Sequence, residues 1–176
     1  MRHTQQIKAS SVLLPITRVT DVWEGTVEKF AEVDTKPLTD WLLPIPFEVW
    51  PQQNPANQEL KPAMTNESWY GLKGVSDYLI DKLHPLLGAP KIRDRMLSVV
   101  MPGHDISPHR DIFGPEWICR VHVPLTTNSW ATFMVESVPY WMGVGYAYKV
   151  NISKVHAVVN NGRTPRIHFM FDCYVA

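Results

Sequence analysis

A histidine and an aspartate two residues apart are the first candidates for chemistry in this sequence. His109 and Asp111 lie in the stretch SPHRDIFG, between a proline and a glycine. In an extended backbone, residues i and i+2 point to the same side, so an imidazole and a carboxylate at these positions can bind one metal ion. Taken alone, such a pair is weak support for a metal site, because short motifs constrain structure only loosely.

A third ligand would have to come from a later strand. Sites with two histidines and one carboxylate leave coordination positions open and are typical of non-haem Fe(II) oxygenases. The candidates for the second histidine are His122, His156 and His168. The sequence alone leaves the choice among these three open.

His156 has one feature that the other two candidates lack. It begins an apolar run, HAVVN, that ends in the turn signal NNG, and Arg166 follows ten positions after it. A strand, a turn and a returning strand over this interval would bring Arg166 back near His156. An arginine there could bind the far carboxylate of a dicarboxylate that chelates the metal, because a guanidinium binds carboxylates in a planar, bidentate manner.

A second arrangement of the same region uses His104 and Asp105 with His109. These residues lie in GHDISPH, directly after the Pro102-Gly103 turn signal. That position favours a loop residue at His104 rather than a metal ligand.

Polar residues recur on one face of two apolar strands. Alternation in WICRVHVPL places Arg120 and His122 together, and alternation in RIHFMFDCYV groups Arg166, His168 and Asp172. A solvated face explains either strand taken alone. Cationic and imidazole residues on several strands of the half that contains His-x-Asp favour a polar interior instead.

The strands that carry these residues fill the second half of the chain. We predict strands over residues 95–101, 117–126, 130–136, 144–152, 156–160 and 166–175. Short, closely spaced strands without intervening helices indicate a mainly β fold, either a sandwich or a jelly roll. Cys119 and Cys173 lie inside two of these strands and are expected to be buried free thiols.

The first half is predicted to be helical and irregular. Thr20 would cap a helix over residues 21–33, and Ser76 would cap a second helix that closes at Gly88. Between them, residues 41–71 contain five prolines and form a long irregular segment. We expect one domain over residues 1–176, with 1–94 as a helical, proline-rich cover and 95–176 as the β core.

Composition limits the possible partners. The chain has 176 residues, and 17 basic residues balance 17 acidic ones, so no overall field attracts nucleic acid or an anionic membrane. The apolar run at residues 12–16 is interrupted by Pro15 and is too short for a signal sequence or a membrane span. We therefore expect a cytoplasmic protein that binds neither nucleic acid nor membranes; its oligomeric state is not predicted.

Several of these motifs together resemble the aspartyl/asparaginyl β-hydroxylase family of Fe(II)- and 2-oxoglutarate-dependent dioxygenases. The resemblance covers about residues 95 to 175 and lies in the joint spacing of its motifs. These are Ser98, His109-x-Asp111, Arg120-x-His122 and the run HAVVNNGRTPRIHFMFD from His156 to Asp172.

The resemblance implies a fold, a set of cofactors and residue roles. The fold would be a double-stranded β-helix, a cupin-like jelly roll, with the N-terminal helices packed on it. Fe(II), 2-oxoglutarate and O2 would be the cofactor and cosubstrates. By the same resemblance, His109, Asp111 and His156 would bind the iron. Arg166 and Ser98 would bind the distal carboxylate of 2-oxoglutarate, and His122 would lie near its iron-bound carboxylate end. Arg120 would bind a carboxylate of the substrate.

The sequence departs from the animal members of the family, which carry glycine where this chain has Asp111. It is more similar to the bacterial branch that retains the triad and includes free-proline hydroxylases. The expected substrate is therefore a carboxylate-bearing free amino acid, or an aspartyl, asparaginyl or prolyl residue in a peptide.

Arg120 and the jelly roll each have an alternative interpretation. A buried Arg120 needs an anionic partner, which could be a substrate or an internal carboxylate such as Glu136 or Asp172. The jelly roll could also belong to a cupin-type isomerase or hydrolase that uses a different metal, or to a non-catalytic binding module. Retention of all three candidate ligands speaks against the binding module.

Overall fold

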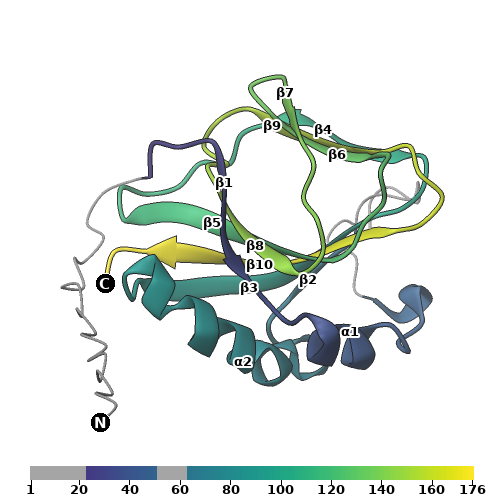
Figure 1. The fold of residues 1–176 in the computed structure, drawn as a ribbon, viewed down its shortest axis with the longest axis horizontal. Coiled ribbons are helices and arrows are strands. Elements are labelled where there is room, and N and C mark those ends of the chain that lie inside the picture. The colour runs from purple at the N-terminus through teal and green to yellow at the C-terminus, as the bar shows by residue number, and fades with distance from the viewer. Residues whose placement is uncertain (1–22, 51–62) are drawn as a thin grey trace, which may run out of the picture.

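Two antiparallel sheets face each other and form the body of the protein (Figure 1). The computed structural model describes residues 23–50 and 63–176. The larger sheet has six strands in the order β1-β8-β5-β10-β3-β2, and the smaller has four in the order β4-β9-β6-β7. The strands are β1 Val27–Glu32, β2 Ala63–Asn66, β3 Lys91–Val100, β4 His104–His109, β5 Trp117–Thr126, β6 Ala131–Val135, β7 Val138–Tyr140, β8 Tyr146–Val150, β9 His156–Asn160 and β10 Arg166–Tyr174.

Two helices cover the larger sheet on the side away from the smaller one (Figure 1). They are α1 Lys36–Leu42 and α2 Leu72–Leu83, and single 3₁₀ turns occupy Phe47–Val49, Trp69–Gly71 and Pro85–Leu87. Leucines of α1 and α2 pack with apolar side chains of β3, β5 and β10 into one core. A second core fills part of the space between the sheets and includes Phe133, Tyr148 and Val158.

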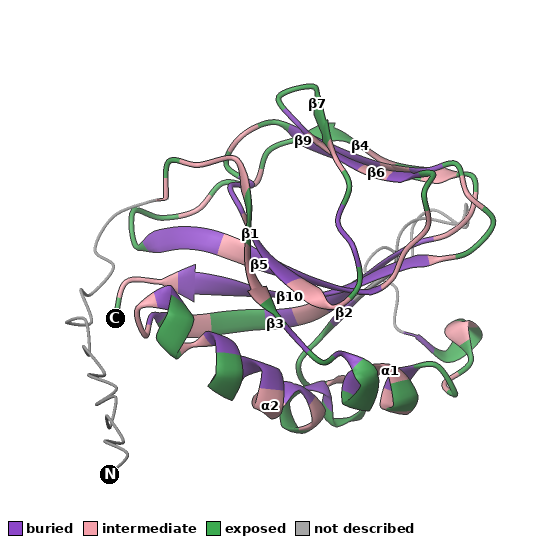
Figure 2. Cartoon of the chain, in the orientation of Figure 1, coloured by how far each residue is buried: buried purple, intermediate pink, exposed green. Residues whose placement is uncertain are grey.

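The central strands β5 and β10 are buried along most of their length because both of their faces are covered (Figure 2). On β10, Ile167, Phe169, Phe171 and Cys173 belong to the core under the helices. The alternate residues therefore face the smaller sheet. Arg166, His168 and Asp172 on that face are at most 2% exposed, so the solvated-face interpretation is wrong for this strand.

The predicted fold class is confirmed: the protein is mainly β, with the two-sheet arrangement of a jelly roll. All six predicted strands are present, and those over 117–126 and 156–160 have the predicted bounds. Cys119 and Cys173 are buried and free, as expected. Within residues 23–50 and 63–176, no helix is long and apolar enough to cross a membrane.

The predicted helix over residues 21–33 is wrong. Residues 27–32 form β1, which pairs with β8 at one edge of the larger sheet, and the proposed cap at Thr20 lies outside the described residues. The pairing shifts register between Lys29 and Ala31, so the two-residue alternation of a strand is interrupted. The apolar spacing that remains imitates a helical stripe.

The second predicted helix exists but begins earlier. Helix α2 starts after Gly71, whose φ of 77° lies in the left-handed region, and Ser76 is a buried residue inside the helix rather than its cap. It also ends earlier than predicted, at Leu83, and Gly88, whose φ is 78°, closes the separate 3₁₀ turn Pro85–Leu87 instead. Strands β1 and β2 also show that the first 94 residues contribute to the larger sheet. The division at residue 94 stays a prediction.

Candidate metal centre and neighbouring cationic site

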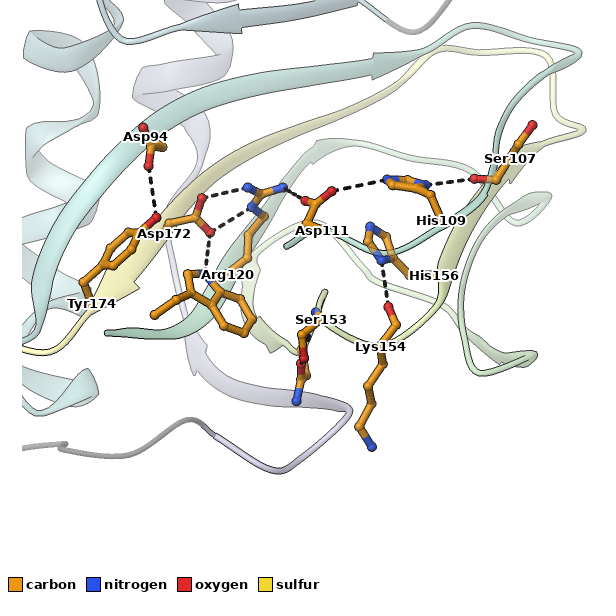
Figure 3. A network of polar contacts seen from close by, with 12 residues as sticks. Asp94, Ser107, His109, Asp111, Arg120, Ser153, Lys154, His156, Asp172 and Tyr174 are labelled. Carbon is orange, nitrogen blue, oxygen red and sulfur yellow. Dashed lines mark hydrogen bonds and ion pairs between the residues drawn. The ribbon is translucent and has the colours of Figure 1, made fainter. Parts of the chain in front are cut away.

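Three candidate ligands meet where β4 ends and β9 begins (Figure 3). His109 and His156 lie opposite each other in the antiparallel pairing of β4 and β9, and their ring centroids are 4.2 Å apart. Asp111 follows β4, and its backbone N–H donates to the carbonyl of Ile152 at 3.0 Å. One ligand atom from each of the three residues lies within 4.8 Å of the others, so the group could hold a metal ion.

Backbone carbonyls fix the orientation of both imidazoles. The Nδ1 atom of His109 is 2.8 Å from the carbonyl oxygen of Ser107, and Nδ1 of His156 is 3.0 Å from that of Lys154. A carbonyl can only accept a hydrogen bond, so each Nδ1 carries the proton and each Nε2 presents a lone pair. Metal-binding histidines are commonly held in this way, and the residues present therefore fit a divalent metal ion.

The carboxylate of Asp111 is held from the side opposite the histidines. Its Oδ1 lies 3.7 Å from Nε2 of His109, while Oδ2 accepts a hydrogen bond from Nη1 of Arg120 at 3.1 Å. Arg120 in turn donates from Nε and Nη2 to the two oxygens of buried Asp172, at 3.0 and 2.7 Å. Figure 3 shows the resulting chain of contacts, which leaves Oδ1 of Asp111 facing the histidines.

The electrostatics of these groups agree with that geometry. Burial lowers the pKa of His156, which favours the neutral imidazole that a metal requires. Burial alone would lower the pKa of Arg120, but its hydrogen bonds and ion pair with Asp172 outweigh burial and raise it. Arg120 is therefore a fixed positive charge beside the metal ligands.

A second cationic group lies on the facing sheet. Arg166 at the start of β10 is 2% exposed, and burial lowers its pKa to about 9. Among residues 23–50 and 63–176, no carboxylate lies within ion-pair distance of its guanidinium; its one hydrogen-bond partner is His168. An unpaired buried cation is unfavourable, so this position is suited to an anionic ligand.

The ring of Phe133 connects the two groups. Its centroid lies 5.9 Å from the ring of His156, 5.3 Å from that of His122 and 5.9 Å from the guanidinium carbon of Arg166. Phe133 is on β6, in the same sheet as β4 and β9. The candidate metal centre and the unpaired cation are therefore neighbours across one aromatic side chain.

The remaining predicted residues lie on the same inner face. His122 is 3% exposed on β5, and Ser98 is 2% exposed on β3. Ser98 pairs in register with His168, two positions along β10 from Arg166. The structure therefore brings Ser98, His122 and Arg166 into one buried region of the larger sheet.

Two sequence interpretations are settled by geometry. His104 and Asp105 do not join the metal cluster, and Nδ1 of His104 instead contacts the carbonyl of Pro102 at 3.0 Å. Of the two internal partners considered for Arg120, Asp172 is the one that it contacts. Sequence reasoning missed the carbonyls that orient the histidines, because every residue has a backbone carbonyl and no residue type signals it.

Comparison with known proteins places these residues in a family context. The family model described as Aspartyl/Asparaginyl beta-hydroxylase matches residues 78–175, which include the three candidate metal ligands. No curated protein matches the sequence.

Solved structures with the same fold include several oxygenases of low sequence identity. A Pseudomonas putida prolyl-4-hydroxylase has a TM-score of 0.59 at 12% identity, over 86% of this chain and 92% of that one. A viral collagen prolyl hydroxylase from Paramecium Bursaria Chlorella virus-1, in complex with 2OG, has a TM-score of 0.55 at 10% identity, over 87% and 98%. A 2OG-Fe(II) oxygenase family oxidoreductase from Burkholderia pseudomallei has a TM-score of 0.55 at 10% sequence identity, over 70% of this chain and 73% of that one.

Proposed function

Because this chain belongs to the aspartyl/asparaginyl β-hydroxylase family, we propose that it is a hydroxylase that uses Fe(II), 2-oxoglutarate and O2. The observation that carries the proposal is the cluster of His109, Asp111 and His156 near buried Arg166, which has no carboxylate partner in the part of the chain that the structure describes. A two-histidine, one-carboxylate group suits Fe(II), and an unpaired guanidinium suits a dicarboxylate cosubstrate. Family membership favours this function over the cupin-type isomerase, hydrolase or binding module.

The residues would divide the work between metal and cosubstrate. His109, Asp111 and His156 would hold Fe(II), which together with 2-oxoglutarate and O2 supplies the oxidising chemistry for hydroxylation of an unactivated C–H bond. Arg166 and the Ser98 hydroxyl would bind the distal carboxylate of 2-oxoglutarate. His122 would lie near its other end, and the carbonyls of Ser107 and Lys154 would keep both histidine ligands in the binding tautomer.

Arg120 is our candidate for substrate recognition. Its guanidinium has N–H groups beyond those that Asp172 and Asp111 accept, and its side chain is 12% exposed beside the candidate metal centre. A carboxylate of the substrate could bind there without displacing the internal ion pair. This contact favours a substrate that bears a carboxylate, which is a free amino acid or an aspartyl residue in a peptide, over an asparaginyl or prolyl residue.

Succinate release from 2-oxoglutarate tests the proposal. The protein would be loaded with Fe(II) without oxygen and then exposed to O2, alone and with free amino acids and aspartyl, asparaginyl or prolyl peptides. Turnover stimulated by one panel member would support the dioxygenase and identify its substrate class. Background turnover alone would support the cosubstrate assignment and exclude the panel. An absence of turnover, with neither iron nor 2-oxoglutarate bound, would refute the function.

A further inference from the structure

His168 is a buried histidine to which the proposed function gives no role. It lies on β10 between Arg166 and Met170, on the face toward the smaller sheet, and is 1% exposed. It is not part of the metal cluster. Its position opposite Ser98 places it between two residues that we assign to the distal carboxylate of 2-oxoglutarate.

Contact with Arg166 determines where the proton of His168 resides. The Nη2 atom of Arg166 lies 3.0 Å from Nδ1 of His168. A guanidinium has no lone pair to offer, so Nδ1 must accept and the ring proton must be on Nε2. Burial and the charge of Arg166 both keep the pKa of His168 well below its usual value, so the ring is neutral. His168 therefore presents a single N–H donor.

That donor has no partner among the residues that the structure describes. The Nε2 atom of His168 is fully buried and makes no hydrogen bond. Buried polar groups are nearly always paired, and an unpaired one is destabilising. Among the same described residues, Arg166 beside it has no carboxylate partner. The Nε2 edge of the ring is the edge away from Nη2 of Arg166, so one oxygen of a carboxylate would accept from His168 and the other from Arg166.

We propose that His168 is a further cosubstrate-binding residue, whose Nε2–H donates a hydrogen bond to the distal carboxylate of 2-oxoglutarate held by Arg166. The inference rests on the proposed function, because it assigns a contact to the cosubstrate named there. It adds a neutral donor to the charged one, so recognition of the distal carboxylate involves a histidine as well as an arginine.

The neighbouring His122 is not equivalent to His168. Its Nδ1 lies 3.4 Å from the Nδ1 of His168, which is already the accepting atom. The one lone pair of that atom already accepts from Arg166 at the shorter distance, so the hydrogen bonds assign a tautomer to His168 and none to His122. The buried Nε2 of His122 also lacks a described partner, and we keep it for the other end of 2-oxoglutarate. Of the two imidazoles, His168 is the one whose N–H donor is assigned to Nε2.

Two matched variants separate the donor from the rest of the side chain. In His168→Asn, the amide oxygen can replace Nδ1 as the acceptor for Arg166, but nothing replaces Nε2–H. In His168→Gln, the longer side chain can place an N–H donor near the position of Nε2. In calorimetry of the Mn(II)-loaded protein, we expect His168→Asn to bind 2-oxoglutarate about tenfold to a hundredfold more weakly than wild type. His168→Gln should recover most of the lost affinity.

A second ligand identifies the end of the cosubstrate that His168 contacts. 2-Oxobutyrate keeps the 2-oxo acid group but has no distal carboxylate, so His168→Asn should bind it as wild type does. Equal weakening for both ligands, or equal affinities of Asn and wild type for 2-oxoglutarate, would overturn the inference. Unchanged Mn(II) affinity would show that the variants are folded.

The wild-type protein provides an independent check. Histidine nitrogen shifts in NMR should show His168 protonated on Nε2, and 2-oxoglutarate should shift that proton downfield in the Mg(II)-loaded, diamagnetic protein. A proton on Nδ1 would overturn the inference even if neither variant folds. Failure of wild type to bind 2-oxoglutarate at all would instead refute the proposed function, so the two failures are distinguishable.

Discussion

At the scale of single residues, the two candidate histidine ligands are oriented by the same local device. The Nδ1–H of each ring donates a hydrogen bond to the carbonyl two positions earlier in the chain, which is that of Ser107 for His109 and that of Lys154 for His156. The contact is short-range and depends on backbone atoms, so side-chain substitution at Ser107 or Lys154 leaves it in place. The lone pairs on Nε2 are therefore available before a metal ion binds.

Loss of either histidine should remove metal binding. We expect His109→Ala and His156→Ala each to weaken Mn(II) binding at least about a hundredfold and to abolish succinate release, because a two-ligand remnant holds a divalent ion poorly. His104→Ala is the matched control, since His104 is on the same strand as His109 but outside the cluster. Metal titration followed by electron paramagnetic resonance measures this. A large loss of affinity in His104→Ala would contradict the assignment.

Arg166 should lower the stability of the ligand-free protein while strengthening the binding of 2-oxoglutarate. We expect Arg166→Met to raise the free energy of unfolding of the ligand-free protein by about 1 kcal/mol, because removal of a buried charge with no described carboxylate partner outweighs the lost hydrogen bond to His168. The same variant should require far more 2-oxoglutarate for turnover. Urea unfolding measures the first effect and succinate release measures the second.

Arg95 provides the control for that prediction. It is also a buried arginine, but its Nη1 pairs with Asp77 and donates to the carbonyl of Lys73. Arg95→Met should therefore lower the free energy of unfolding, by about 1–3 kcal/mol. If Arg166→Met were destabilising to the same degree, Arg166 would have a structural role instead.

At the scale of elements, the connection from β9 to β10 sets the distance between His156 and Arg166. Asn160 at the end of β9 is fully buried and donates to the carbonyls of Val100 and Thr164, at 2.8 and 2.9 Å. Its Oδ1 accepts from the backbone N–H of Gly162 at 3.1 Å. One side chain thus joins the end of β3 to the turn that precedes β10.

Asn160→Ala should therefore be destabilising. We expect a loss of about 2–4 kcal/mol in the free energy of unfolding, because buried carbonyl and N–H groups are left without partners. Asn161→Ala is the control, because that side chain is exposed. Urea denaturation measures the free energy of unfolding of both variants. A similarly small decrease in the two would show that the turn is stable without the hydrogen bonds of Asn160.

The sequence predicted the central strands well because their signals are local. β5 and β9 have the predicted bounds, since each is a continuous apolar run ended by turn residues. β4, by contrast, was not predicted. Its sequence HDISPH has little apolar content and includes Pro108, which an edge strand tolerates, and β4 is at the edge of its sheet.

The internal partner of Arg120 could not be predicted from the local sequence. Glu136 and Asp172 are both carboxylates on or beside strands, and the sequence offered no means to choose between them. The register of β5 on β10 places Asp172 directly opposite Arg120, whereas Glu136 pairs with Lys154. Register depends on the pairing of distant strands, so only the folded chain shows which carboxylate is used.

At the scale of the whole molecule, the two sheets carry different parts of the site. His109 and His156 belong to the four-stranded sheet, with Asp111 directly after its strand β4. Arg166, Ser98 and His122 belong to the six-stranded sheet. A metal ion would therefore contact one sheet and its following loop, while 2-oxoglutarate bound to that metal would span both sheets.

This division predicts that metal and cosubstrate stabilise the fold cooperatively. Mn(II) alone at about 100 times its dissociation constant should stabilise the protein by about 2.7 kcal/mol, the mass-action value for one site. Added 2-oxoglutarate should give a large further increase in Tm with Mn(II) and a much smaller one without it, because only the metal-bound ligand is held from both sheets. In Arg166→Met the Mn(II) shift should persist and the cosubstrate shift should disappear. An equal cosubstrate shift with and without Mn(II) would mean that the six-stranded sheet binds 2-oxoglutarate by itself, and the two halves of the site would then act independently.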